Sequence, residues 1–257
     1  MITSASNPEV RAVAALRHRS ERELTGLCLV EGEIEIRRAL QAGIGLETLY
    51  VREGVSTSLV DQVSRVMTVS NGAFERIAYG RNGVVAVARC PHFGLGDLVL
   101  LRPELLLIVE GLEKPGNLGA ILRTANAVGA AVVAASPATD LTNPNVIRAS
   151  LGTVFTVSLG AGSTNEVIEF LTERNLSLAV AVVGGGKPPW QVDLTKPVAI
   201  AIGSEDRGLS AELTVAADLA LSLPMSGGAD SLNASVTAAV MLYESFRQRT
   251  LENPVDP

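Results

Sequence analysis

Three segments of the chain place glycines and polar side chains directly after an apolar run. The first, "KPGNLGAILRTANAVGA" at 114–130, contains Asn117 and Arg123. The second, "VAIAIGSEDRGLS" at 198–210, contains Glu205, and the third, "LPMSGGADSLNASV" at 223–236, contains Ser231 and Asn233. Because glycine lets a backbone approach a ligand closely, polar side chains in such turns are candidates for ligand binding or catalysis.

The first segment does not match the familiar nucleotide-binding loops. A dinucleotide fingerprint needs three glycines spaced as G-x-G-x-x-G and an acidic residue closing the next strand. Here Gly116 and Gly119 stand alone, and the next strand ends in "AAS". No G-K-[ST] follows, so a P-loop is also absent. These absences disfavour a nucleotide-dependent oxidoreductase.

Each polar side chain also has a purely structural interpretation. Asn117, Ser231 and Asn233 can act as helix N-caps. Glu205 can be a solvated turn residue. Arg123 has packing residues as neighbours, which predicts a place near the buried face of its helix, where a guanidinium needs an anionic partner.

Two further features bear on ligand binding. The turn "VVGGGKPP" at 182–189 is either a flexible surface turn or a ligand-binding loop at Val183 and Gly184. The loop before Ser231 is longer and richer in glycine than helix capping requires, which favours close approach to a ligand.

The elements around these segments predict an α/β fold. The runs "LLLIVE", "AAVVAAS", "VFTVSLG", "SLAVAVV" and "VAIAIG" are apolar throughout, which is typical of parallel strands covered on both faces. Helical stretches at 117–129, 163–174, 208–217 and 233–249 alternate with them. Open sheets of this kind bind ligands at the carboxyl ends of their strands, where Glu205 is predicted to lie.

The first third of the chain predicts a smaller α/β domain. A helix begins in "NPEVRAVAALRHR" at 7–19, with Asn7 as N-cap and Pro8 at its first position. Strands follow at "LCLVEG", "LETLYV", "VMTVS" and "VVAVAR", and a helix at "EIEIRRALQAG". The segment "PHFGLGD" at 91–97 reads as a linker. We therefore predict domains at residues 1–95 and 96–257.

The composition indicates a soluble globular protein. Of 257 residues, 47% are apolar and 19% charged, and no apolar run approaches the ~20 residues that span a bilayer. The N-terminus lacks the layout of a signal peptide, so we expect a cytoplasmic protein without membrane contact. Cys28 and Cys90 lack metal-ligand spacing; we expect no metal site and interpret both as small packing residues.

Charge is distributed unevenly along the chain. The net charge is −6, which alone argues against nucleic-acid binding. Residues 1–95, however, hold eleven arginines and no lysine against ten acidic residues, with Arg11, Arg17, Arg19 and Arg22 near the start. This arginine-rich part is either a salt-bridged surface or a face that docks RNA.

The three segments, in this order, resemble the three motifs of the SpoU (TrmH) branch of the SPOUT RNA methyltransferases. The resemblance covers roughly residues 100–250, with Lys114 where the family often carries Asp. It implies a deep trefoil knot in the C-terminal domain, a homodimer with the site at its interface, and 2′-O-methylation of ribose from S-adenosylmethionine. The first domain looks like the L30e-like RNA-binding domain of rRNA-modifying members, which favours rRNA over tRNA.

The resemblance also implies roles for individual residues. Arg123 would position the 2′-hydroxyl and stabilise charge developing on its oxygen. Asn117 would orient the start of its helix, Glu205 would brace Arg123 or the cofactor side, and Ser231 and Asn233 would shape the pocket. The cofactor would lie against Gly203, Leu223, Leu232, Met225, Val183 and Gly184.

Some alternatives stay open at this point. One is a tRNA ribose methyltransferase, and another is a ribosome-associated RNA-binding protein without catalysis. Within rRNA modification, a housekeeping enzyme and an enzyme that confers resistance to a ribosome-targeting antibiotic are not distinguished by these residues.

Overall fold

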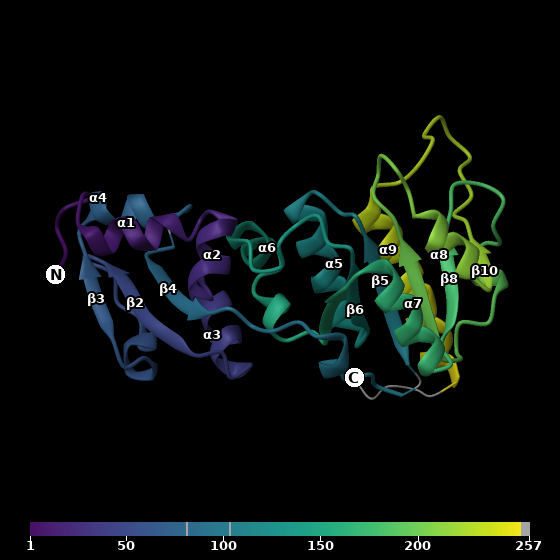
Figure 1. Ribbon diagram of the computed structural model, residues 1–257, viewed down its shortest axis with the longest axis horizontal. Helices are drawn as coiled ribbons and strands as arrows, with labels where there is room; N and C mark the ends of the chain where they lie inside the picture. Colours follow the sequence, from purple (N-terminus) through teal and green to yellow (C-terminus); the bar gives the residue numbers. More distant parts are fainter. Residues whose placement is uncertain (81, 103, 253–257) are drawn as a thin grey trace. The chain divides into compact units, whose positions relative to one another are not determined.

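The structure is a computed structural model that describes residues 1–80, 82–102 and 104–252. It divides into two compact units (Figure 1). Unit 1 comprises Met1–His92 and Asp140–Thr156, and unit 2 comprises Phe93–Thr139 and the chain from Val157 onward. The first change of unit falls at the predicted linker, whereas Asp140–Thr156 packs with unit 1. The last five residues of the predicted 96–257 domain lie outside the described residues.

Unit 2 is built on a six-stranded parallel sheet with the order β10-β8-β9-β5-β6-β7 (Figure 1). Its strands are β5 (Leu105–Glu110), β6 (Ala131–Ala135), β7 (Leu159–Gly162), β8 (Ser177–Ala181), β9 (Val198–Ile202) and β10 (Leu219–Leu221). Its helices are α5 (Pro115–Val128), α7 (Thr164–Glu173), α8 (Ala211–Ala216) and α9 (Ala234–Glu252), with short 3-10 turns η2 (Leu95–Asp97) and η4 (Pro189–Gln191). The predicted α/β fold with a parallel sheet is confirmed.

Both faces of this sheet are covered, as the apolar strands predicted. All six residues of β5 are buried, although alternate residues of a strand point to opposite faces. On one face Leu106 and Ile108 pack with Val167 of α7 and Leu213 of α8. The helices α5 and α9 pack against each other and contact β6 and β9. The sheet therefore holds the turns at its strand ends in fixed positions.

Two boundaries predicted in the C-terminal part of the chain were wrong. The run "VFTVSLG" is not one strand: Thr153–Phe155 forms the 3-10 turn η3 after Gly152, whose φ is +77°, and β7 begins only at Leu159. The helix predicted at 208–217 begins at Ala211, because Ser210 accepts a hydrogen bond from the backbone of Leu213 as its N-cap.

Unit 1 contains a four-stranded mixed sheet with the order β1-β4-β2-β3. Its strands are β1 (Leu27–Glu31), β2 (Leu46–Arg52), β3 (Val66–Val69) and β4 (Val84–Arg89). Its helices are α1 (Pro8–Ala15), α2 (Arg19–Thr25), α3 (Glu33–Gln41), α4 (Asn71–Ile77) and α6 (Pro144–Ala149), with 3-10 turns η1 (Ser58–Gln62) and η3. The side chain of Asn7 caps α1 as predicted, but α1 ends at Ala15 and a separate helix, α2, follows.

The segment Asp140–Thr156 is held in unit 1 by specific contacts. The buried guanidinium of Arg22 forms an ion pair with Asp140 and donates to the backbone oxygens of Leu16 and Arg17. Arg38 donates to the backbone oxygen of Leu151 at 2.6 Å. A side chain at Gly152 would lie 2.9 Å from Cα of Glu35, so the backbones meet there at close range. Arg22 therefore belongs to a buried ion pair and not to an exposed arginine-rich face, because its side chain is 2% exposed.

Candidate active site

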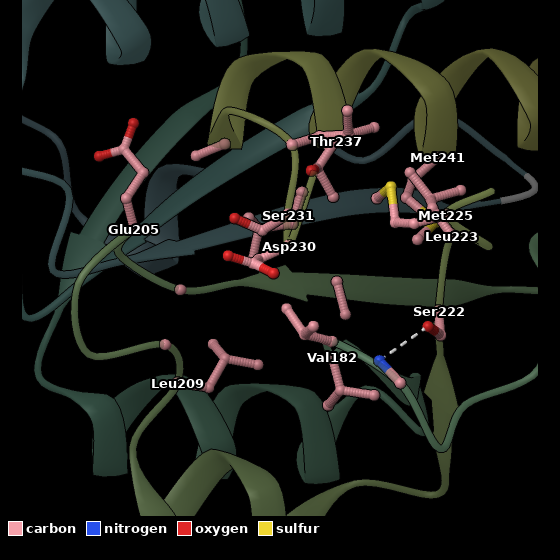
Figure 2. Close-up of a pocket in the computed structure, with 18 of the residues that line it drawn as sticks. Val182, Glu205, Leu209, Ser222, Leu223, Met225, Asp230, Ser231, Thr237 and Met241 are labelled. Carbon is pink, nitrogen blue, oxygen red and sulfur yellow. Dashed lines mark hydrogen bonds between the residues drawn. The ribbon is translucent and has the colours of Figure 1, made fainter. Parts of the chain in front are cut away.

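A cavity of about 600 Å³ lies at the carboxyl ends of β8, β9 and β10, beside the start of α9 (Figure 2). The residues predicted to contact a cofactor all line it: Val183, Gly184, Gly203, Leu223, Met225 and Leu232. Ser231 and Glu205 line it as well. Glu205 lies at the opposite end of the cavity from Leu223 and Met225 (Figure 2).

The glycine turn after β8 is pinned to β10. Gly184 donates its backbone N–H to Oγ of Ser222 at 3.1 Å (Figure 2). Lys187 donates to the backbone oxygen of Ala220, and Ser222 donates to that of Lys187, each at 2.9 Å. A side chain at Gly186 would lie 2.6 Å from the carbonyl carbon of Leu221, so only glycine fits this crossing. The turn is thus a wall of the cavity and not a free surface loop.

A second close approach shapes the turn after β9. A side chain at Gly203 would overlap the carbonyl group of Gly208, because the turn folds back on itself. Ser204 and Gly208 exchange two backbone hydrogen bonds, of 3.2 and 2.9 Å, and Gly208 has a φ of +67°. This tight turn presents Glu205 toward the other two segments.

The three glycine-bearing segments meet at the carboxylate of Glu205. Its Oε1 accepts hydrogen bonds from Nδ2 of Asn117 and, at 3.1 Å, from Nδ2 of Asn233. Nδ2 of Asn233 also lies 3.2 Å from Oδ1 of Asn117. Nζ of Lys114 lies 3.5 Å from the other carboxylate oxygen of Glu205. Sequence reasoning did not anticipate this ion pair, since Lys114 was noted there only as a departure from the family pattern.

The capping roles considered for the two asparagines differ. Asn117 is the third residue of α5 and does not cap it, because the helix begins one residue after Lys114, its N-cap. Asn233 accepts hydrogen bonds at Oδ1 from the backbone N–H and the hydroxyl of Ser235, at the start of α9. Asn233 therefore supports its helix and joins the polar network together.

Arg123 lies where the sequence interpretation did not place it. We predicted a position near the buried face of α5, but the side chain is exposed. The buried stripe of α5 runs through Leu118, Ile121, Leu122 and Ala125 instead. Within the described residues Arg123 has no hydrogen-bond or ion-pair partner, and Glu205 is engaged by Asn117, Asn233 and Lys114. Glu205 therefore does not brace Arg123 within one chain.

Sequence reasoning missed several lining residues, among them Asp230, Thr237 and Met241. Asp230 lies in the loop before Ser231, and its carboxylate adds to that of Glu205 at the cavity. Thr237 and Met241 line the cavity from α9. Their spacing of four residues places them on one helix face, and this was the available signal.

The profile of the SpoU rRNA Methylase family matches residues 104–243, more than half of the chain. The chain belongs to the SpoU rRNA methylase family. The profile of the MRM3-like substrate binding domain matches residues 7–88 of this SpoU-family chain.

Three similar proteins illustrate the relationship. A 23S rRNA (uridine(2479)-2′-O)-methyltransferase of Streptomyces viridochromogenes is 30% identical over 92% of the SpoU-family chain and 88% of its own length. A crystal structure of an RNA 2′-O ribose methyltransferase is 42% identical, with a TM-score of 0.86 over 96% of this chain and 98% of that one. The SpoU methyltransferase AviRb from Streptomyces viridochromogenes, in complex with AdoMet, is 29% identical. Its TM-score is 0.89 over 95% of this chain and 100% of that one.

The described residues contain no group of three or more His, Cys, Asp or Glu side chains able to hold a metal ion. No helix in this part of the chain has the length and apolar character needed to cross a membrane. Cys28 is buried, as the packing interpretation predicted, whereas Cys90 is only partly buried.

Proposed function

We propose that this SpoU-family chain methylates the 2′-oxygen of a ribose in 23S rRNA, in the cytoplasm, with S-adenosylmethionine as the methyl donor. The observation that carries the proposal is the convergence of Asn117, Glu205 and Asn233 beside one cavity. The substrate assignment is supported by the Streptomyces viridochromogenes relative, which acts on 23S rRNA.

The cavity suits S-adenosylmethionine in size and chemistry. Its volume of about 600 Å³ lies in the range of small-molecule sites. Within the described residues, no hydrogen bond engages the backbone N–H or C=O of Leu223 or Leu232, so these groups are available to the edge of an adenine. The carboxylates of Glu205 and Asp230 favour a ligand that carries a positive charge. When bound, the cofactor supplies an electrophilic methyl group on a sulfonium.

The polar residues of the site act on the RNA. We assign to Arg123 the binding of ribose and phosphate oxygens and the stabilisation of charge on the 2′-oxygen, because its guanidinium is exposed and unpaired within the described residues. A guanidinium keeps its proton, so the proton of the 2′-hydroxyl leaves to water or to a neighbouring group. Glu205 holds Asn117 and Asn233 in place, and Ser231 shapes the cavity.

The proposal includes a homodimer. The apolar side chains of Val236, Val240 and Tyr243 recur along α9 and are each at least 37% exposed. Their spacing places them on one stripe of the helix. Because α5 packs against α9, a second copy on this stripe would approach Arg123, and the active site would then combine the cavity of one protomer with Arg123 of its partner. The trefoil knot also stays a prediction.

The decisive experiment is methyl transfer to purified RNA. The full-length protein is incubated with radiolabelled S-adenosylmethionine and, separately, with 23S rRNA, 16S rRNA and total tRNA. We expect label in 23S rRNA, at a single position resistant to alkaline hydrolysis, because a 2′-O-methyl group blocks cleavage of the adjacent phosphodiester.

Several outcomes would contradict the proposal. Label in tRNA alone would favour a tRNA ribose methyltransferase. Binding of rRNA without any label would favour a non-catalytic RNA-binding protein. Label on a base, which leaves the position sensitive to alkali, would contradict the reaction itself.

A further inference from the structure

Tyr79 is an exposed aromatic side chain in a protein with few of them. Aromatic residues make up 4% of the chain, and Tyr79, in unit 1 just after α4, is 41% exposed. The guanidinium carbon of Arg17 lies 4.3 Å from the centroid of its ring, and that of Arg148 lies 5.4 Å away. One partly exposed ring thus contacts two cations contributed by separate segments, before α2 and within α6.

The backbone around Tyr79 is held rigidly. Glu31, which is 5% exposed, accepts hydrogen bonds from the backbone N–H of Tyr79 at 2.8 Å and of Gly80 at 2.6 Å. A side chain at Gly80 would lie 2.9 Å from a carboxylate oxygen of Glu31, so the carboxylate would have to shift to admit one. Arg17 donates to the backbone oxygen of Ala78. A buried carboxylate and a guanidinium therefore fix the aromatic ring before any ligand arrives.

The two arginines differ from most of their neighbours in unit 1. Five other arginines of the unit form ion pairs with carboxylates: Arg19, Arg22, Arg37, Arg65 and Arg89. Within the described residues, neither Arg17 nor Arg148 lies in an ion pair. Arg148 is exposed and donates to Oδ1 of Asn145 at 3.1 Å, and Arg17 is partly exposed and donates only to the backbone oxygen of Ala78 among the described residues. These two guanidiniums keep charge and donor groups available for an anion.

We propose that Arg17, Tyr79 and Arg148 form a binding site for one unpaired nucleotide of the RNA substrate. The guanidiniums bind its phosphate through charge-assisted hydrogen bonds. The base stacks on the exposed part of the ring or on a guanidinium plane, the way proteins hold bases in single-stranded loops. The inference rests on the proposed function, since it names where unit 1 contacts the same RNA.

The first test separates stacking from packing. Tyr79→Phe keeps the ring and loses the hydroxyl, whereas Tyr79→Leu keeps an apolar side chain and loses the ring. Loss of one base-stacking contact typically weakens binding by about 5- to 150-fold. We expect Tyr79→Leu to raise KM for 23S rRNA within this range while kcat and S-adenosylmethionine affinity stay within twofold, and Tyr79→Phe to stay within twofold throughout.

The second test isolates the phosphate contacts. Each contact to a single-stranded phosphate contributes about 0.7 to the slope of log Kd against log salt concentration. The double variant Arg17→Gln/Arg148→Gln is expected to lower that slope by about this amount in filter binding with 23S rRNA, because both guanidiniums bind the same phosphate. Tyr79→Leu is expected to leave the slope unchanged. Arg89→Gln is the matched control, because Arg89 is exposed and already paired with Glu47.

The outcomes distinguish this site from the proposed function. If wild-type protein transfers methyl groups to no RNA, the proposed function fails, and the salt-dependent binding still tests the site. If wild-type protein is active and Tyr79→Leu has an unchanged KM, the inference is overturned. Should Tyr79→Leu unfold, photo-crosslinking of 5-iodouridine-substituted 23S rRNA to the wild-type protein decides it: a crosslinked peptide containing Tyr79 supports the site, and crosslinks confined to other peptides refute it.

Discussion

Asn117 and Asn233 are joined by a side-chain hydrogen bond of 3.2 Å, although 116 residues separate them in the sequence. Both also donate to the same oxygen of Glu205. One asparagine belongs to α5 and the other precedes α9, and Glu205 lies in the turn after β9. The carboxylate therefore couples three segments, so that a displacement of one segment alters the hydrogen bonds of the other two.

Replacing Glu205 by Gln tests this coupling. Gln keeps the length of the side chain but loses the charge that holds Lys114 and satisfies both amides. The side chain is 24% exposed, so we expect the free energy of unfolding to change by only about 1 kcal/mol. The rate of methyl transfer should fall by roughly 10- to 100-fold, because the asparagines lose their orientation. Asp206→Asn, at an adjacent exposed carboxylate, is the control, and equal rates for both variants would contradict the coupling.

Removing the side chain of Arg123 should affect the reaction and little else. The side chain is exposed, so Arg123→Ala should change the free energy of unfolding by no more than about 0.5 kcal/mol. Loss of one preorganised donor typically lowers the rate by about 10²–10³-fold. Single-turnover methyl transfer at saturating RNA measures the rate, and calorimetry should give unchanged S-adenosylmethionine affinity.

Two companion variants sharpen the result for Arg123. Arg123→Lys should restore little activity, because an ammonium group cannot reproduce the planar fork of a guanidinium. Arg102→Ala, at a side chain that is 90% exposed, should behave as wild type. A near-wild-type rate for Arg123→Ala would remove Arg123 from the catalytic residues.

A methyl group at Gly203 should damage the cavity. In Gly203→Ala, Cβ would overlap the carbonyl group of Gly208, and a flexible side chain is not available to move aside. We expect a loss of about 1–3 kcal/mol in the free energy of unfolding and weak S-adenosylmethionine binding by calorimetry. Gly72→Ala in α4 is the control: no atom lies within 4 Å of its Cβ position, and helix propensity favours Ala. Wild-type cofactor affinity in Gly203→Ala would show that the turn does not shape the site.

The Arg22–Asp140 pair should make stability depend on pH. Burial of the carboxyl group of Asp140 acts to raise its pKa, but hydrogen bonds from Arg22 and Thr142 outweigh burial, so the pKa lies below its ordinary value. A depressed pKa stabilises the fold above the unfolded-state pKa of about 3.9, and this contribution disappears as the pH falls through the lower folded-state pKa.

Urea unfolding from pH 7 down to pH 3 checks this expectation. The difference in unfolding free energy between wild type and Asp140→Asn should be constant near neutral pH and shrink below about pH 4. Arg22→Ala should cost about 3–5 kcal/mol, because it leaves a half-buried carboxylate without its partner. A difference that stays constant down to pH 3 would show that the pair does not perturb Asp140.

Much of the fold was predictable because its signals are local. The apolar runs of β5 and β9 and the Pro8 start of α1 each report on residues a few positions away. The glycines that follow the strands were also informative, since Gly203 and Gly186 are required by close backbone approaches that exclude any side chain. All six cofactor-contact candidates accordingly line one cavity.

The errors arose where distant residues decide the structure. The exposure of Arg123 depends on which face of α5 packs against the rest of unit 2. The apolar residues next to Arg123 in the sequence do not determine which face that is. The pairing of Glu205 with Lys114 joins residues far apart in the chain. The run at 154–160 reads as a strand by composition, yet Val154 is buried in a 3-10 turn of unit 1.

The packing of Asp140–Thr156 with unit 1 bears on the order in which the protein folds during synthesis. The second segment of unit 1, Asp140–Thr156, is translated only after Phe93–Thr139 of unit 2. At 5–20 residues per second, Asp140 is synthesised roughly 2–10 s after His92, and Thr156 roughly 3–13 s after it. Until then Arg22 lacks its carboxylate partner, and unit 1 is incomplete. If the chain were cut at the linker, the N-terminal fragment would lack Asp140–Thr156. In the C-terminal fragment, Val146 and Ile147 would lose the surface of unit 1 that buries them.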